Sequence, residues 1–238
     1  MVGLGAVWSL KVDVAGAPDP ETGYLVGIDR IDAAVREQVL PWLLECWKNT
    51  PEHTPTALLP GIMERLKPCF KVPIQAIELQ PEPFGRYRME TSEMSMVTII
   101  RQYTFCASHR LAVAGCTDAE NHALYGKCSN PNGHGHNYEV EVAMQVPLDV
   151  DAIDARRLDQ IVDSTLIDRF DHKHLNEDLS DFKDLTASVE NITARCSELL
   201  EGPISEAGGQ LRWVTVWETA RTACTIEAGI PQETTAKG

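Results

Sequence analysis

Apolar and polar residues follow two periodicities along this chain. Alternation predicts strands, and an apolar residue at every third or fourth position predicts helices. In the first hundred residues these patterns predict strands at 7–14, 73–79 and 85–90 and helices at 28–47 and 56–66. Pro41 is expected to kink or split the first helix, and Pro81-Glu82-Pro83 is expected to be the turn between the second and third strands.

The same order of strand, helix, helix, strand and strand is predicted again in the second half. The ranges are 138–146, 154–169, 188–200, 211–217 and 222–227, and a further strand is expected near 103–111. The repeat favours an α+β protein made of two tandem units, 1–95 and 96–238. The alternative is that ordinary α+β patterning produced the shared order twice.

Composition narrows the class of protein. The net charge of -14 argues against a nucleic-acid partner, because phosphates would be repelled. No apolar run is long enough to span a membrane, and the first residues resemble no targeting peptide, so a cytoplasmic location is expected. The 7 cysteines show no disulfide-framework spacing, which favours reduced thiols.

A glycine-rich loop leads into the strand that carries the most chemistry. If that strand begins at His134, alternation places His134 and His136 on one face, and Gly135 between them allows close approach of another group. A sheet that pairs the segment ending near His109 with this strand would bring a third imidazole alongside. Three histidines without a fourth protein ligand describe a catalytic zinc site with an open position. Ordinary polar histidines near a surface are the alternative.

Other polar residues are candidates for catalytic or substrate-binding roles, and each also has an ordinary structural interpretation. Cys128, beside Lys127, is either a thiol with a lowered pKa or an inert buried one. Asp171 and His172 form either a proton-handling pair or a polar loop, and His174 is expected to be a solvated loop histidine. Glu218 ends a strand, where it either binds a guanidine-like edge or faces solvent.

Two of these segments resemble a known family. Residues 105–111, Phe-Cys-Ala-Ser-His-Arg-Leu, together with 125–138 are similar to the signature of the 6-pyruvoyl-tetrahydropterin synthases, a family that includes the 6-carboxytetrahydropterin synthases. Five residues separate Cys128 from His134, a spacing typical of the pyruvoyl type. The first unit resembles the family more weakly and has no equivalent of these residues, so it is expected to be catalytically silent.

The resemblance implies a fold, a site and a reaction. The fold is an antiparallel sheet with two helices on one face in each unit, assembled as a homo-oligomer with active sites at the seams. Zn2+ would be held by His109, His134 and His136. Catalysis would use Cys128, Asp171 and His172, and Glu218 would anchor the pterin.

The substrate implied is a pterin triphosphate, 7,8-dihydroneopterin triphosphate. Since the chain is acidic, local cations such as Arg110, Lys127 and Lys173 must offset its charge near the phosphates. The segment 187–191 departs from the family's Pro-Thr-x-Glu-Asn, although Ser188 can still cap a helix. A 6-carboxytetrahydropterin synthase and a zinc-dependent pterin-binding protein without turnover are the alternative functions.

Overall fold

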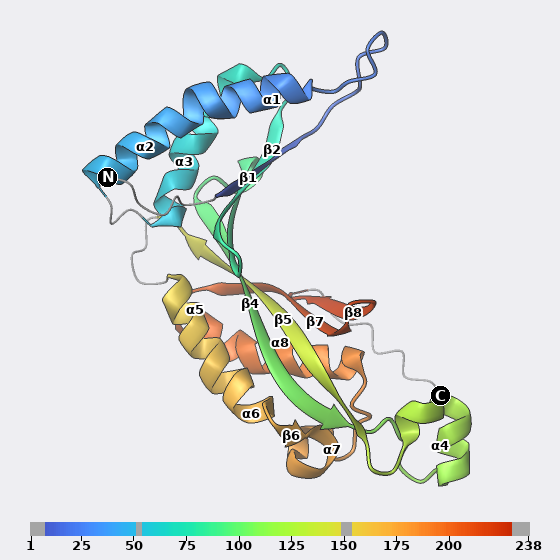
Figure 1. The fold of residues 1–238 in the computed structure, drawn as a ribbon. Helices are drawn as coiled ribbons and strands as arrows, with labels where there is room; N and C mark the ends of the chain where they lie inside the picture. Colours follow the sequence, from blue (N-terminus) through green and yellow to red (C-terminus); the bar gives the residue numbers. More distant parts are fainter. Residues whose placement is uncertain (1–7, 51–53, 149–153, 230–238) are drawn as a thin grey trace, which may run out of the picture. The chain divides into compact units, whose positions relative to one another are not determined.

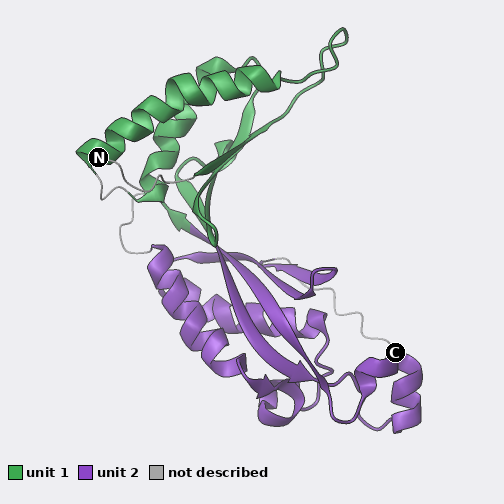
Figure 2. Cartoon of the chain, in the orientation of Figure 1, with its two compact units in different colours: residues 1–100, 146–152 green, residues 101–145, 153–238 purple. Residues whose placement is uncertain are grey.

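The computed structural model describes residues 8–50, 54–148 and 154–229. The chain divides into two compact units, distinguished by colour in Figure 2: unit 1 is Met1–Ile100 with Val146–Ala152, and unit 2 is Arg101–Gln145 with Ile153–Gly238. Val7 and the N-terminal residues judged for a targeting peptide lie outside the described residues. The duplication with units 1–95 and 96–238 stays a prediction.

Unit 1 packs helices against a sheet whose strand order is β1-β2-β3-β4, with β4, Met96–His109, contributing its first residues. Its elements are β1 Ser9–Val14, α1 Ile28–Ala34, η1 Val35–Val39, α2 Leu40–Asn49, α3 Pro55–Leu66, η2 Lys67–Cys69, β2 Ile74–Glu82, β3 Gly85–Glu90 and η3 Thr91–Glu93. Helix α3 contacts β2 and β3, where fully buried Leu59 and Met63 face a core that includes Ile77 and Met89. The predicted helix at 56–66 and strand at 85–90 are confirmed.

Two local predictions in unit 1 need correction or refinement. Strand β2 continues through Glu82, which pairs with Gly85, so the chain turns at Pro83-Phe84 and not at Pro81-Glu82-Pro83. The helix predicted at 28–47 runs as α1, the π-helical segment η1 and α2. Pro41 lies in the first turn of α2, directly after the π-helical segment. Proline has no backbone N–H, and this loss is tolerated here because the helical hydrogen-bonding pattern already changes at this point.

Unit 2 carries β5 next to β7 and β7 next to β8, both in antiparallel pairs, with β4 on the other side of β5 (Figure 1). The strands are β4 Met96–His109, β5 His134–Pro147, β6 Lys173–His174, β7 Gln210–Thr219 and β8 Thr222–Glu227. The helices are α4 Asp118–Tyr125, η4 Gly126–Ser129, α5 Ala155–Val162, η5 Asp163–Ile167, α6 Asp168–Phe170, α7 Leu175–Asp178, η6 Ser180–Phe182 and α8 Val189–Glu206. The short strand β6 pairs with β4 in parallel.

Helix α8 packs on β7 and β8, and α5 packs beside it, so unit 2 is an α+β layer structure (Figure 1). Buried Ile192, Cys196 and Leu200 of α8 recur at helical spacing and face Val214 and Val216 of β7. The expected cap is confirmed, because the Ser188 side chain accepts a hydrogen bond from the Asn191 N–H at 3.4 Å. In the strand order β4 lies beside β5, which positions the site.

The described part of the chain contains no helix that combines the length and apolar character needed to cross a bilayer.

Candidate active site

Three histidines converge where β4 ends and β5 begins. Strand β5 starts at His134, as predicted, and alternation turns His134 and His136 to the same face as buried Tyr138. His109 is the last residue of β4, and its Nε2 lies 3.1 Å from the Nε2 of His134. One ligand atom from each of the three imidazoles lies within 4.8 Å of the others. The predicted convergence of these residues is therefore present within one chain.

Hydrogen bonding orients His109 for metal binding. Its Nδ1–H donates to the carbonyl oxygen of Ala187 at 2.6 Å, which leaves the lone pair of Nε2 facing His134. Burial lowers the pKa of His109 to about 4; the bond to Ala187 opposes this shift, and the neighbouring imidazoles add to it. The pKa of His134 is also lowered, first by burial and then by His136. Both rings are neutral at pH 7, as a metal ligand must be.

The side chains at this site have the chemistry of metal ligands. Among the described residues, His134 Nδ1 and His136 Nε2 are buried without a hydrogen-bond partner. A buried polar atom without a hydrogen-bond partner destabilises the folded state. A cation bound in front of such a nitrogen would give it a partner. Three neutral imidazoles are a donor set that suits zinc, among other transition metals.

Glu218 reaches the same histidines from β7. Its Oε1 lies 3.3 Å from His109 Nε2 and 3.8 Å from His136 Nε2. The carboxylate is mostly buried and is not part of the set whose donors all lie within 4.8 Å of one another. Glu218 can therefore contribute a negative charge beside a bound cation, and its role as a pterin anchor stays a prediction.

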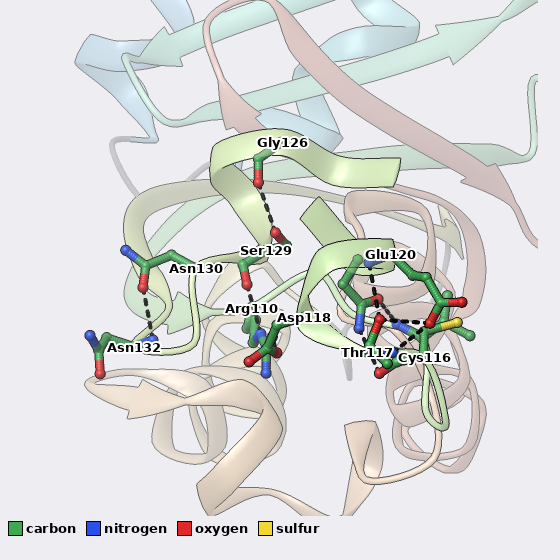
Figure 3. A network of polar contacts seen from close by, with 11 residues as sticks. Arg110, Cys116, Thr117, Asp118, Glu120, Gly126, Ser129, Asn130 and Asn132 are labelled. Atoms are coloured by element: carbon green, nitrogen blue, oxygen red, sulfur yellow. Dashed lines mark hydrogen bonds and ion pairs between the residues drawn. The ribbon is translucent and has the colours of Figure 1, made fainter. Parts of the chain in front are cut away.

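The loop between α4 and β5 is held by its own polar contacts, shown in Figure 3. Ser129 Oγ donates to the carbonyl of Gly126 at 2.8 Å, and Arg110 Nε donates to the carbonyl of Ser129 at 2.8 Å. Arg110 also pairs with Asp118 at 2.6 Å. These contacts fix the turn Gly126–Ser129, in which Cys128 is half-buried.

Helix α4 was not anticipated from the sequence, although it carries a recognisable signal. Thr117 and Glu120 form a capping box, in which the Thr117 side chain accepts from the Glu120 N–H and the Glu120 side chain accepts from the Thr117 N–H. The Ser/Thr-x-x-Glu spacing that precedes a helix could have identified it.

Asp171 and His172 form the expected pair. His172 Nδ1 lies 2.7 Å from Asp171 Oδ2, and His172 adopts a positive φ of 57°. The other Asp171 oxygen, Oδ1, accepts from the Cys106 N–H at 2.8 Å, and His172 N–H donates to the Cys106 carbonyl at 2.6 Å. The pKa of Asp171 is lowered, first by the Cys106 N–H and then by His172. The pair is thus attached to β4 at Cys106.

The proposed proton-transfer groups are not joined by a hydrogen bond in the described part of the chain. Among the described residues, the Cys128 thiol makes no hydrogen bond to Asp171 or His172. Exposed Cys106 lies beside the pair instead, and its Sγ donates to Asn137 Oδ1 at 3.2 Å. No sequence signal pointed to Asn137.

The expectation that His174 is solvated is wrong. His174 is half-buried, its Nδ1 is buried without a partner among the described residues, and its Nε2 packs against Gly133. A Cβ added to Gly133 would lie 2.7 Å from His174 Nε2 and 2.9 Å from the His109 carbonyl, at a φ of 70° that favours glycine. No local sequence pattern predicted that β6 pairs with β4, and this pairing places His174 beside Ser108 of β4.

Comparison with protein families identifies one family. The family profile of 6-pyruvoyl tetrahydropterin synthase matches residues 98–229, more than half of the chain. A 6-pyruvoyl tetrahydrobiopterin synthase of Homo sapiens is 35% identical over 124 residues, covering 51% of this chain and 84% of the human protein. A Drosophila melanogaster protein of the same name is 35% identical over 104 residues, but the match spans only 62% of its length.

A solved structure is similar over the same region. The Caenorhabditis elegans 6-pyruvoyl tetrahydropterin synthase shares 34% sequence identity at a TM-score of 0.51, with 56% of this chain and 95% of that chain covered. The matched range 98–229 contains the three converging histidines and the other predicted site residues: His109, His134, His136, Cys128, Asp171, His172 and Glu218.

Proposed function

Because the chain belongs to the 6-pyruvoyl tetrahydropterin synthase family, we propose that it converts 7,8-dihydroneopterin triphosphate to 6-pyruvoyltetrahydropterin and releases triphosphate. Family membership makes it an enzyme of pterin synthesis. The observation that carries the finer proposal is the convergence of His109, His134 and His136, of which His134 and His136 each have a buried ring nitrogen without a hydrogen-bond partner among the described residues.

His109, His134 and His136 would hold the metal, and Ala187 would keep His109 in the required tautomer. Zinc bound there would polarise the side-chain oxygens of the substrate and make the adjacent C–H bonds more acidic. Glu218 would either accept hydrogen bonds from the guanidine-like edge of the pterin or add its charge to the metal set.

Cys128, as a thiolate, would take a proton from the side-chain carbon next to the phosphate-bearing carbon. The electron pair then expels triphosphate by breaking the C–O bond. Asp171 would hold His172 in one tautomer, so that its Nε2 can deliver and collect the remaining protons. The hydroxyl-bearing carbons become carbonyls while the dihydropterin ring takes up the electrons, so no external oxidant is needed.

We infer that Cys128 and His172 act together across the interface of a homo-oligomer, because among the described residues the Cys128 thiol makes no hydrogen bond to His172. In the order of the described strands, β1 and β8 lie at the two ends, so each has one edge without a described partner strand, where another chain can pair. Such an interface would place a thiol of one copy beside the Asp171–His172 pair of the next.

Product analysis after anaerobic incubation with dihydroneopterin triphosphate tests the function. We expect 6-pyruvoyltetrahydropterin and one equivalent of triphosphate. Acetaldehyde with 6-carboxytetrahydropterin would instead make the protein a 6-carboxytetrahydropterin synthase. Binding of the substrate without turnover by the zinc-loaded oligomer would leave only a pterin-binding role.

A further inference from the structure

His174 lies next to the histidine set but has no part in the proposed function. It belongs to β6, which pairs in parallel with β4 just before that strand ends at His109 (Figure 1). Its half-buried ring lies against Gly133, the residue directly before His134. His174 is not a member of the set that converges for a metal, so it can act on a bound metal only through a neighbour.

The segment that carries His174 is attached to β4 on both sides. Upstream, the His172 N–H donates to the Cys106 carbonyl at 2.6 Å. Downstream, Asn176 Oδ1 accepts from the Arg110 N–H at 2.8 Å. Between these two hydrogen bonds, strand pairing holds the His174 backbone in register with β4. The ring of His174 therefore has a fixed place beside the end of β4.

Gly133 is confined between the His174 ring and the backbone of His109. A Cβ added to Gly133 would lie 2.7 Å from His174 Nε2 and 2.9 Å from the His109 carbonyl oxygen, distances at which one of the groups must shift. Gly133 has a φ of 70°, which favours glycine, and its N–H donates to the Asn130 carbonyl at 2.8 Å. The backbone directly before His134 therefore has little room to move.

His134 depends on this backbone for its orientation more than His109 does. A hydrogen bond to the Ala187 carbonyl orients the ring of His109. The corresponding atom of His134, its Nδ1, is buried without a hydrogen-bond partner in the part of the chain that the structure describes. Its Nε2 nevertheless faces His109 Nε2 at 3.1 Å. Since no outer hydrogen bond fixes this ligand, the position of its backbone must do so.

We propose that His174 is a positioning residue of the metal centre, which confines Gly133 and so fixes the point from which His134 presents its Nε2. This role rests on the metal site of the proposed function, and it assigns His174 no contact with the metal itself. Removing the ring should therefore change metal affinity and ligand geometry while all three ligands remain.

Zinc affinity, measured by competition with a chelator, tests this role without turnover. His174→Ala should weaken zinc binding by ~10-fold or more, the scale for residues that orient metal ligands. His174→Gln carries a planar amide about as far from the backbone as Nε2 and should restore most of the affinity. His122→Ala, exposed on α4, is the control and should bind zinc as the wild type does. Equal affinities for the wild type and His174→Ala would overturn the proposal.

A double-mutant cycle tests whether His174 acts through Gly133. Gly133→Ala should weaken zinc binding by a larger factor in the wild type than in His174→Ala, because one of its two close contacts is then gone. Gly135→Ala is the matched control, since its added Cβ would meet the Ala107 carbonyl at an ordinary 3.5 Å. Its effect should be the same in both backgrounds. Equal effects of Gly133→Ala in both backgrounds would contradict the proposal.

Cobalt(II) in place of zinc gives a readout that a loss of stability alone does not move. The visible absorption of the cobalt-loaded protein reports ligand geometry, and His174→Ala should shift it more than His174→Gln does. An unchanged spectrum with a lower melting temperature would mean a purely structural role and refute the inference.

The outcomes also separate this role from the proposed function. A protein that shows these effects of His174→Ala but forms no 6-pyruvoyltetrahydropterin would refute the function and leave the positioning role standing. A protein that forms this product but binds zinc independently of His174 would refute only the positioning role. A wild type that binds no divalent metal would overturn both.

Discussion

His109 donates its Nδ1 proton to the backbone carbonyl of Ala187, 2.6 Å away, and so ties the end of β4 to the residue before the cap of α8. The helix thereby orients a metal ligand without supplying one. This coupling predicts that metal binding and the stability of unit 2 depend on each other, because a metal that binds only the folded chain stabilises it.

Metal content tests the histidine set first. We expect one tightly bound zinc per chain, and His134→Ala should abolish it, because two imidazoles hold zinc poorly. His122→Ala, on the exposed face of α4, is the matched control and should retain the metal. Elemental analysis measures both, and a fall in melting temperature on chelation should accompany the loss. Undiminished zinc in the His134 variant would contradict the assignment.

Cys128→Ala should leave zinc and pterin binding intact but lower kcat by at least ~100-fold, the usual scale for losing a positioned proton-transfer group. Cys106→Ala is the informative comparison, because Cys106 lies beside the Asp171–His172 pair in the same chain. If Cys106→Ala shows the large loss and Cys128→Ala does not, the thiol that moves protons has been misassigned.

Stability of the metal-free protein should fall as the pH is lowered from about 6.5 toward 4. The pKa of His109 is lowered to about 4, mainly by burial, whereas the same ring in the unfolded chain titrates near 6.5. Between these values the unfolded state binds more protons, so the free energy of unfolding rises with pH across this window and is greatest above it. The full effect is roughly 3 kcal/mol.

Urea denaturation at intervals across this pH range measures the slope. His109→Gln should flatten it, and His122→Gln should not. An unchanged slope in the His109 variant would mean that other groups set the pH dependence.

We expect Asp181 to contribute to the stability of unit 2 and not to catalysis. Its buried carboxylate accepts from Arg169 at 2.6 Å and from Arg195 at 2.6 Å, which joins η6 to α6 and α8. Asp181→Asn should cost about 2 kcal/mol, less than for a fully buried pair because both arginines are partly solvated. Chemical denaturation measures the loss, and exposed Asp184→Asn is the control. If Asp181→Asn lowers the free energy of unfolding by less than Asp184→Asn does, Arg169 and Arg195 have found other partners.

Assembly is the remaining prediction. Light scattering should give a homo-oligomer, because β1 and β8 end the order of the described strands and the Cys128 thiol makes no hydrogen bond to His172 among the described residues. We expect a chain truncated to 97–238 to lose the native assembly and turnover, since it lacks β1 to β3. A fully active monomer, or a truncated chain that keeps both properties, would contradict this.

Much of the site could be predicted from the sequence because its determinants are local. Alternation in β5 placed His134 and His136 on one face, and the start of that strand at His134 is confirmed. Ser188 was identified as a cap because a hydroxyl before a helical pattern satisfies a free N–H. The α+β class likewise followed from periodicity.

Only the tertiary structure decided which distant groups face each other. No local pattern links His109 to Ala187, or Asp171 to the Cys106 N–H, since each bond joins segments more than 60 residues apart. His174 shows the difference most clearly. Its sequence neighbours suggested a solvated loop, but β6 pairs with β4 and the His174 ring lies against Gly133. Backbone periodicity fixes the face on which a side chain lies, whereas long-range strand pairing chooses its neighbours.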